Sequence, residues 1–334
     1  LSGHVGTAAG DDFFTNFIAQ PVEPIIWFAI FVLLTSVVVI IGVQKGIEKA
    51  STILMPVLIV LIIAISLYCI TRPGAAAGVK YYLFPDIKHF SATTVLAAMG
   101  QLFYSMSLAM GIMITYGSYM KKDDDLRDSV RKIEIFDTLI AFLAGLLIVP
   151  SVFVSGGSKD ALSKGPSLMF ITLPKVFDSM NLGGLIGGAF FILVLFAALT
   201  SSISLLETNV SIVCDKLHWG RKKATIAITI YVLIIGGLVS LGFGPLSFVK
   251  ILGMGLLDFS DFISNSVLMP IVAMLTCIFV GFIVKPKTII DEVENSGSFK
   301  EKKFYVVMLK WIAPICLALI LIFAVSEALG FITV

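Results

Sequence analysis

Eight long apolar runs follow one another along this chain of 334 residues, and they restrict its fold more than any other feature. Each run has close to the 20 or so apolar residues that a helix needs to cross a bilayer. The runs cover residues 25–43, 52–70, 91–120, 127–154, 181–213, 224–242, 254–284 and 304–327. Only 14% of the residues are charged, and the mean hydropathy is +1.02, outside the range of globular proteins. We therefore expect an all-α fold, a polytopic membrane helix bundle that occupies residues 25–334.

Basic residues are divided unequally between alternate loops. One set of loops holds 16 lysines and arginines, and the opposite set holds 7. Because basic loops stay on the cytoplasmic side, the first set is expected inside and residues 1–24 form an extracellular loop. The outer loop 155–180 contains an apolar stretch that is too short to span, so a re-entrant or capping helix is expected there. The expected location is the inner (plasma) membrane, crossed several times.

Residue patterns typical of several other functions are missing from the sequence. No basic cluster interleaved with aromatic residues indicates nucleic acid binding. The four cysteines lie in or beside apolar runs without CxxC spacing, so they are expected to be core residues. An intramembrane aspartyl protease would need two facing carboxylates, whereas Asp137 is the one acid expected near the midplane. The chain is therefore not expected to be an enzyme.

The stretch 97–120 is unusual for a membrane helix because small and hydroxyl residues gather at its centre. Ser105, Ser107, Ala109 and Gly111 alternate with larger residues. In hydrocarbon a helix can open only where it lines protein or a wet cavity, and such a break frees carbonyls for cations. The alternative is a continuous helix whose small residues allow close packing. The stretch alone leaves both interpretations open.

A single carboxylate is expected deep in the fourth run. Asp137 follows Arg127 by ten residues, which at 1.5 Å per residue places it ~15 Å into the membrane. A charge at this depth costs several kcal/mol unless it is paired, and no basic residue is expected at the same depth. A bound metal cation or a proton is the simplest partner; the alternative is a protonated aspartic acid that bonds to a neighbouring helix.

Three further polar features lie in the apolar runs. The hydroxyl triplet Thr200–Ser202 lies at the centre of the fifth run; it suits a hard monovalent cation, or it bonds back to its own helix. Asp258 and Asp261, at the outer end of the seventh run, form an outer gate or are simply solvated. Glu207 is expected to be satisfied by its neighbours.

Four segments resemble the neurotransmitter:sodium symporter family. GQLFYSMSLAMGIMITYGSYMKKDDD (100–125) is similar to its unwound sixth helix, and DTLIAFLAG (137–145) to its seventh. AALTSSISLLE (197–207) is similar to its eighth helix, and KGPSLMFITLPKVF (164–177) to its fourth external loop. The resemblance implies a leucine-transporter-like inverted-repeat fold. It also implies a truncated set of eight spans, the fourth to the eleventh, with the first three absent from this chain.

The resemblance assigns sodium ligands residue by residue. It implies that Ser105 and Asp137 bind a first sodium ion. It implies that the Ala197 carbonyl, Thr200 and Ser201 bind a second one. Sodium is the expected coupling ion.

The resemblance also assigns a substrate pocket and a gate. The residues implied to line the pocket are Tyr104, Ser105, Ser107, Met110, Ser201 and Leu205. Gln101 matches a glutamine of the outer vestibule, and Asp261 matches the acid of the outer gate.

The expected function is sodium-coupled symport of an amino acid across the cytoplasmic membrane. Apolar Met110 and Leu205 favour a hydrophobic or aromatic substrate. The fixed charge of Asp137 beside the implied chloride site makes chloride-independent transport the expectation. The alternatives are a non-transporting membrane fragment or a structural membrane protein, with the aspartyl protease third. The expected partners are the amino acid, sodium ions and the lipid bilayer, and the oligomeric state is left open.

Overall fold

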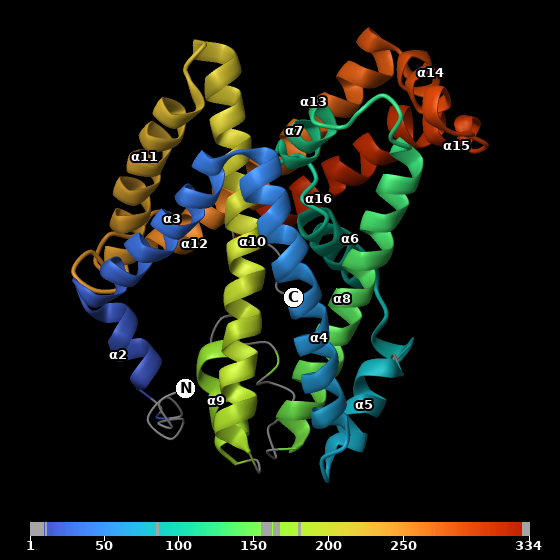
Figure 1. Ribbon diagram of the computed structural model, residues 1–334. Helices are drawn as coiled ribbons and strands as arrows, with labels where there is room; N and C mark the ends of the chain where they lie inside the picture. The colour runs from blue at the N-terminus through green and yellow to red at the C-terminus, as the bar shows by residue number, and fades with distance from the viewer. Residues whose placement is uncertain are drawn as a thin grey trace. The chain divides into compact units, whose positions relative to one another are not determined.

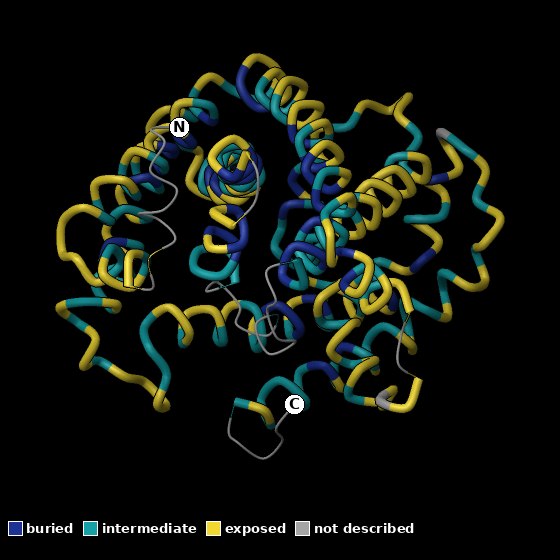
Figure 2. Tube along the Cα trace, turned by 90° about the horizontal axis from the view of Figure 1, so that it is seen from below, coloured by how far each residue is buried: buried dark blue, intermediate teal, exposed yellow. Residues whose placement is uncertain are grey.

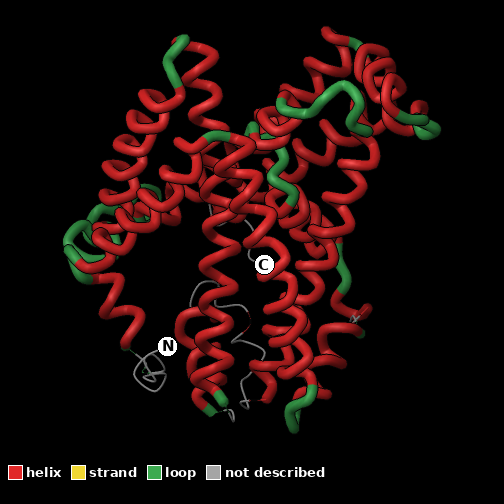
Figure 3. The backbone as a smooth tube through the Cα atoms, viewed as in Figure 1, coloured by secondary structure: helices red, strands yellow, loops and turns green. Residues whose placement is uncertain are grey.

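The computed structural model describes residues 10, 12–84, 87–154, 162, 168–179 and 182–328. These residues are almost entirely helical and contain no strand (Figure 3). Seven helical stretches among them are long and apolar enough to cross a membrane. These stretches are Glu23–Ile41, Val43–Ile70, Leu126–Val154, Gly183–Leu217, Arg221–Leu241, Leu256–Val284 and Lys302–Ala328. The predicted all-α class is confirmed, while the limits of the membrane-embedded residues stay predictions.

The seven stretches correspond to labelled helices in Figure 1. Four of them contain one α-helix each: α3 (Glu23–Ile41), α8 (Leu126–Val154), α10 (Gly183–Leu217) and α11 (Arg221–Leu241). In the other three, π-helical turns adjoin the α-helices, which are α4 (Lys49–Ile70), α12 (Leu256–Asp261), α13 (Met269–Ile278), α15 (Lys302–Val307) and α16 (Ala313–Ala328). The shorter helices are α2 (Phe13–Ala19), α5 (Ala75–Leu83), α6 (Ala92–Ser105), α7 (Ile112–Ser118), α9 (Leu173–Asp178) and α14 (Pro286–Ser296).

The chain forms two compact units. The first contains Leu1–Asp86 and Leu139–Val249, and the second contains Ile87–Thr138 and Lys250–Val334. Helix α8 is continuous and contributes its first half to the second unit and its second half to the first. Each unit is described below by itself.

The core of the first unit is built around α4, α8, α9 and α10. Its fully buried members include Ile62 on α4, Leu147 on α8, Phe177 on α9 and Phe190 on α10. The rings of Phe177 and Phe190 pack with their centroids 5.2 Å apart. Helix α9 lies in the loop where a re-entrant or capping helix was expected, and its apolar side chains are buried in this core. Its place relative to the membrane stays a prediction, and residues 155–161 and 163–167 of the same loop lie outside the described part.

Helices α3, α10 and α11 pack side by side in the first unit (Figure 1). Large exposed apolar side chains recur every three or four residues along one face of α3: Trp27, Ile30, Leu34, Val37 and Ile41. Burial alternates with exposure along the long helices in this way (Figure 2). A continuous exposed apolar stripe on a helix of this length is suited to lipid, which agrees with a multi-pass membrane protein.

The second unit joins α6 and α7 to the helices of the C-terminal part. Helix α16 packs against both α6 and α13. The start of α8 is tied to the linker before α15, because Arg127 donates to Glu301 at 2.7 Å and to the Ser298 carbonyl at 3.2 Å. The second unit contains both the sequence stretch 97–120 and Asp137.

Candidate functional site

Helix α6 ends at Ser105 and α7 begins at Ile112, so the helix in the central stretch is interrupted. Between them the backbone enters the left-handed region three times, with φ of 54° at Ser107, 61° at Ala109 and 79° at Gly111. A right-handed helix cannot continue through such residues. The interrupted-helix interpretation is confirmed, and the continuous helix is wrong.

The break exposes main-chain oxygen atoms. The amides of Met106, Ser107 and Leu108 still bond back to α6. In the described part of the chain, however, no backbone amide donates to the carbonyls of residues 105–110. Carbonyls without a helical partner are suitable ligands for a hard cation. Glycine tolerates this conformation at Gly111, whereas Ser107 and Ala109 adopt it at a cost because each carries a Cβ.

Ser105 and Asp137 meet at this break. The Ser105 hydroxyl donates to Asp137 Oδ1 at 2.7 Å, and the pair is partly buried. Ser105 is the last residue of α6, whereas Asp137 lies on α8, 32 residues later. Among the ion pairs of the described residues, none involves Asp137. One carboxylate oxygen is therefore left for a further partner, and whether that partner is a cation or a proton stays a prediction.

Two hydroxyls of the triplet on α10, those of Thr200 and Ser202, bond to their own helix. Thr200 Oγ1 donates to the Ala197 carbonyl at 3.0 Å and to the Phe196 carbonyl at 3.1 Å. This is the back-bonding alternative. The same geometry places Ala197 O and Thr200 Oγ1 side by side, so both oxygens can face one cation when the hydroxyl proton turns away.

An exposed stripe runs along α10 through the triplet. It contains Leu195, Ala198, Ser201, Leu205 and Asn209. Its members recur every three or four residues, which is the spacing of one helix face. Two of the predicted substrate residues, Ser201 and Leu205, thus lie on one open face of the first unit.

A cavity of about 530 Å³ lies in the second unit. Gln101 and Tyr104 line it from α6, and Asp261 and Asn265 line it from the segment where α12 ends. The Asn265 amide donates to Asp261 Oδ1 at 2.5 Å. Three residues predicted for the vestibule, the gate and the pocket therefore surround one space. Glu327 also lines this cavity, although no sequence pattern predicted it there.

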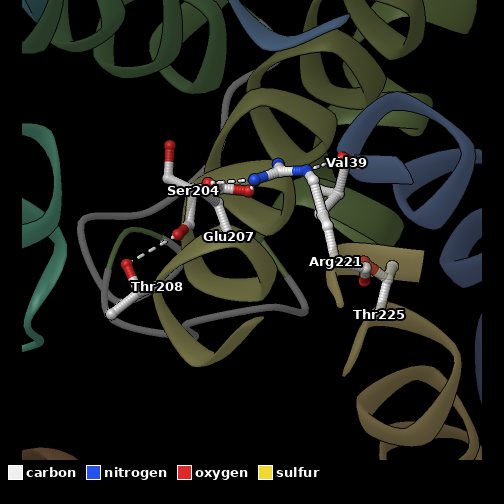
Figure 4. A network of polar contacts seen from close by, with 6 residues as sticks. All are labelled: Val39, Ser204, Glu207, Thr208, Arg221 and Thr225. Carbon is white, nitrogen blue, oxygen red and sulfur yellow. Dashed lines mark hydrogen bonds and ion pairs between the residues drawn. The ribbon is translucent and has the colours of Figure 1, made fainter. Parts of the chain in front are cut away.

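Glu207 is completely buried and is paired with Arg221 (Figure 4). Arg221 Nη1 donates to Glu207 Oε1 at 3.0 Å, and Nη2 contacts the second carboxylate oxygen. Arg221 Nε donates to the Val39 carbonyl at 2.9 Å, so one guanidinium joins α10, α11 and α3. The expectation that neighbours satisfy Glu207 is confirmed. Arg221 precedes the predicted run 224–242, and its pairing with Glu207 was not predicted from the sequence.

The predicted ligands form two groups that belong to different units. Ser105 and Asp137, with Tyr104, Ser107 and Met110 nearby in sequence, belong to the second unit. Ala197, Thr200, Ser201 and Leu205 belong to the first. The structure brings Ser105 to Asp137 and the Ala197 carbonyl to Thr200. A shared pocket for the other residues and the convergence of the two groups stay predictions.

The donor atoms in both groups are oxygens of carboxylate, hydroxyl and carbonyl groups. Among the described residues, no three His, Cys, Asp or Glu side chains come together as a metal site. Soft thiolate and imidazole ligands, which select transition metals, are therefore not gathered in this part of the chain. The donor set fits a hard monovalent cation.

Comparison with known proteins identifies what the chain is similar to. The profile of the sodium:neurotransmitter symporter family matches residues 18–330. The uncharacterized sodium-dependent transporter YhdH of Bacillus subtilis (strain 168) is 34% identical over 93% of this chain and 68% of its own length. A sodium-dependent transporter of Haemophilus influenzae is 32% identical over 92% of this chain and 66% of its own length.

A solved structure is also similar to this chain. The crystal structure of MhsT in complex with L-phenylalanine is 40% identical in sequence and has a TM-score of 0.84. The match covers 93% of this chain and 70% of the MhsT chain. The chain thus spans about two thirds of the length of these relatives.

Proposed function

Because this chain belongs to the sodium:neurotransmitter symporter family, we propose that the complete protein is a sodium-coupled symporter of amino acids in the cytoplasmic membrane. Membership confirms the predicted family, and the likeness to MhsT confirms the predicted leucine-transporter-like fold. The family is one of sodium-coupled transporters, which confirms that the chain is not an enzyme and that Na⁺ is the coupling ion. The activity, the substrate and the site residues of this protein are the proposal.

The observation that carries the proposal is the Ser105–Asp137 pair beside a broken helix. A carboxylate on an apolar helix needs a cation, and the pair offers one full charge with carbonyl oxygens close in sequence. Sodium at this position orders residues 106–111, and these residues also line the proposed substrate pocket. Sodium binding therefore favours substrate binding, and the substrate favours sodium equally, because coupling between sites is reciprocal.

The membrane potential drives the coupled step. A potential of 100 mV is worth about 2.3 kcal/mol per charge that crosses it. Two sodium ions, one at Ser105 and Asp137 and one at Ala197, Thr200 and Ser201, would contribute close to 5 kcal/mol before their concentration gradient is added. The second ion depends on oxygens of the first unit and is proposed on the Ala197–Thr200 geometry.

We expect a hydrophobic or aromatic amino acid as the substrate. Met110 at the break and Leu205 on the open face of α10 offer apolar surface, while Ser107 and Ser201 offer hydroxyls. The solved relative MhsT holds L-phenylalanine. Transport is proposed to be independent of chloride, since the Asp137 carboxylate already supplies a fixed negative charge beside the first sodium.

Uptake of labelled phenylalanine into vesicles that contain the complete protein tests the proposal. An inward sodium gradient should raise initial uptake at least tenfold over an equal potassium gradient, and replacement of chloride by gluconate should leave it unchanged. Equal uptake with sodium and potassium would contradict the sodium coupling. Loss of uptake in gluconate would contradict chloride independence alone.

A further inference from the structure

A partly buried hydroxyl pair joins α3 to α10 directly beside the proposed second sodium ligands. Thr35 Oγ1 and Ser202 Oγ lie 2.9 Å apart, and Thr35 is only 3% exposed. Ser202 is the next residue after Ser201 and the second after Thr200. We propose that this hydrogen bond sets the rotation of α10 about its axis, so that Thr35 acts as a positioning residue for the second sodium site. The inference rests on the proposed sodium-coupled transport.

The two hydroxyls form a closed network with their own helices. Thr35 Oγ1 lies 3.0 Å from the Phe31 carbonyl, and Ser202 Oγ lies 2.9 Å from the Leu199 carbonyl. Three contacts therefore share two hydroxyl protons. A hydrogen bond between the helices forms when one of the two hydroxyls turns its proton from its own helix to the other oxygen, so it needs both Thr35 and Ser202.

The position of Ser202 determines which way its neighbours point. Successive side chains on an α-helix are about 100° apart, so Thr200 and Ser202 point about 160° away from each other. Ser202 is turned toward α3, whereas Ser201 is exposed. A side-chain oxygen lies about 5 Å from the helix axis, so a rotation of about 20° would move it by roughly 1.7 Å. Metal–ligand distances tolerate only about 0.2 Å.

The backbone Ala197 carbonyl would respond less to such a rotation, because it lies closer to the helix axis. A turn of α10 would therefore move Thr200 Oγ1 more than Ala197 O relative to an ion that other elements help to hold. For this reason loss of the Thr35 hydroxyl should weaken sodium binding without removing any ligand.

The chain contains a matched control pair. Ser36 Oγ and Thr229 Oγ1 lie 2.7 Å apart between α3 and α11, and both residues are buried. Each also contacts a carbonyl four residues earlier in its own helix, at 2.8 Å for Ser36 and 2.7 Å for Thr229. The two pairs thus resemble each other in bonding, although the second is the more buried, and only the first holds α10. Removal of either should destabilise the fold by a similar amount.

The experiment compares Thr35→Val and Thr229→Val in the complete protein reconstituted in vesicles. The half-saturating sodium concentration for phenylalanine uptake should rise about fivefold in Thr35→Val, which corresponds to the loss of one typical hydrogen bond. Thr229→Val should stay within about twofold of the wild type. The maximal rate should change little in both, and Thr35→Ser should restore the wild-type sodium dependence.

A second variant distinguishes the loss of this hydrogen bond from misfolding. Ser202→Ala removes the same bond from the other helix and should raise the sodium requirement as Thr35→Val does. The double variant should be no worse than either single one, because both remove one interaction. Equal sodium requirements in Thr35→Val and Thr229→Val, or additive effects in the double variant, would overturn the inference. Sodium-independent uptake by the wild type would overturn the proposed function as well.

Discussion

Ser105 and Asp137 come from helices 32 residues apart and meet at 2.7 Å. A hydrogen bond to a charged group contributes about 1.5–3 kcal/mol. In the proposed site this bond orients the carboxylate, and the serine oxygen lone pairs remain available to the ion. In the proposed site, the Asp137 carboxylate and the Ser105 hydroxyl therefore act together as ligands of one cation.

Replacement of Ser105 tests the hydroxyl directly. Ser105→Ala should raise the half-saturating sodium concentration for uptake by about tenfold, since it removes both a ligand and the orientation of Asp137. Ser105→Thr keeps the hydroxyl and should stay within about threefold of the wild type. Ser129→Ala is the control, because the Ser129 hydroxyl donates to the Asp125 carbonyl at the start of α8. An effect of Ser129→Ala as large as that of Ser105→Ala would contradict a specific role.

The sequence predicted some of these residues and not others, for physical reasons. Asp137 could be found because a single acid in a long apolar run needs a partner at its depth. Its pairing with Ser105 required the family resemblance, since contacts between helices are not encoded by local spacing. Thr35 stayed unnoticed because a hydroxyl in an apolar helix usually bonds to its own backbone, and its second bond depends on α10.

At the scale of elements, the interruption between α6 and α7 depends on residues that tolerate positive φ. Gly111 has φ of 79° as the last residue before α7. A side chain in the left-handed region costs about 1–2 kcal/mol. The alternation of small and large residues in the sequence is compatible with an interrupted helix. It does not distinguish this from a continuous helix, because the same pattern also allows close helix packing.

A pair of glycine variants separates strain from packing. Gly111→Ala should lower the free energy of unfolding by about 1 kcal/mol and reduce uptake, since alanine disfavours this backbone conformation. Gly117→Ala lies inside α7, where an added Cβ meets no atom within 4 Å, and should stabilise by about 0.5–1 kcal/mol. Thermal unfolding in detergent should therefore move in opposite directions. A shift in the same direction would contradict the strain argument.

The Glu207–Arg221 pair predicts a non-additive effect on stability. Arg221→Gln should lower stability by about 3 kcal/mol, because it leaves the fully buried Glu207 carboxylate without its partner. Adding Glu207→Gln should recover much of that loss, since no charge then remains buried. Denaturation of the single and double variants measures the coupling. A double variant less stable than Arg221→Gln alone would contradict the buried ion pair.

At the scale of the whole molecule, the division of basic residues predicts how the chain is oriented in the membrane. Lys222 at the start of α11 belongs to the basic, inner set of loops, and Lys80 on α5 belongs to the opposite set. Both residues are exposed. Single cysteines at the two positions should therefore react differently with an impermeant maleimide. Lys80→Cys should be labelled in intact cells and Lys222→Cys only after permeabilisation; the reverse pattern would contradict the orientation.

The division into two units separates what could be predicted from hydropathy from what could not. The eight apolar runs indicated the helices, because hydrocarbon requires every backbone group to bond internally. The residues that the resemblance assigns belong to both units, and Asp137 lies in the part of α8 that belongs to the second unit. A convergence of these residues does not follow from hydropathy, and it stays a prediction from the family resemblance.

Equilibrium binding of radiolabelled sodium to the purified complete protein tests the role of Asp137 most directly. The wild type should bind sodium saturably, and phenylalanine should tighten that binding. Asp137→Asn keeps the size and one oxygen of the side chain but removes its charge, so it should weaken sodium binding at least tenfold and remove the effect of phenylalanine. Sodium binding by Asp137→Asn equal to that of the wild type would contradict a cation site at this carboxylate.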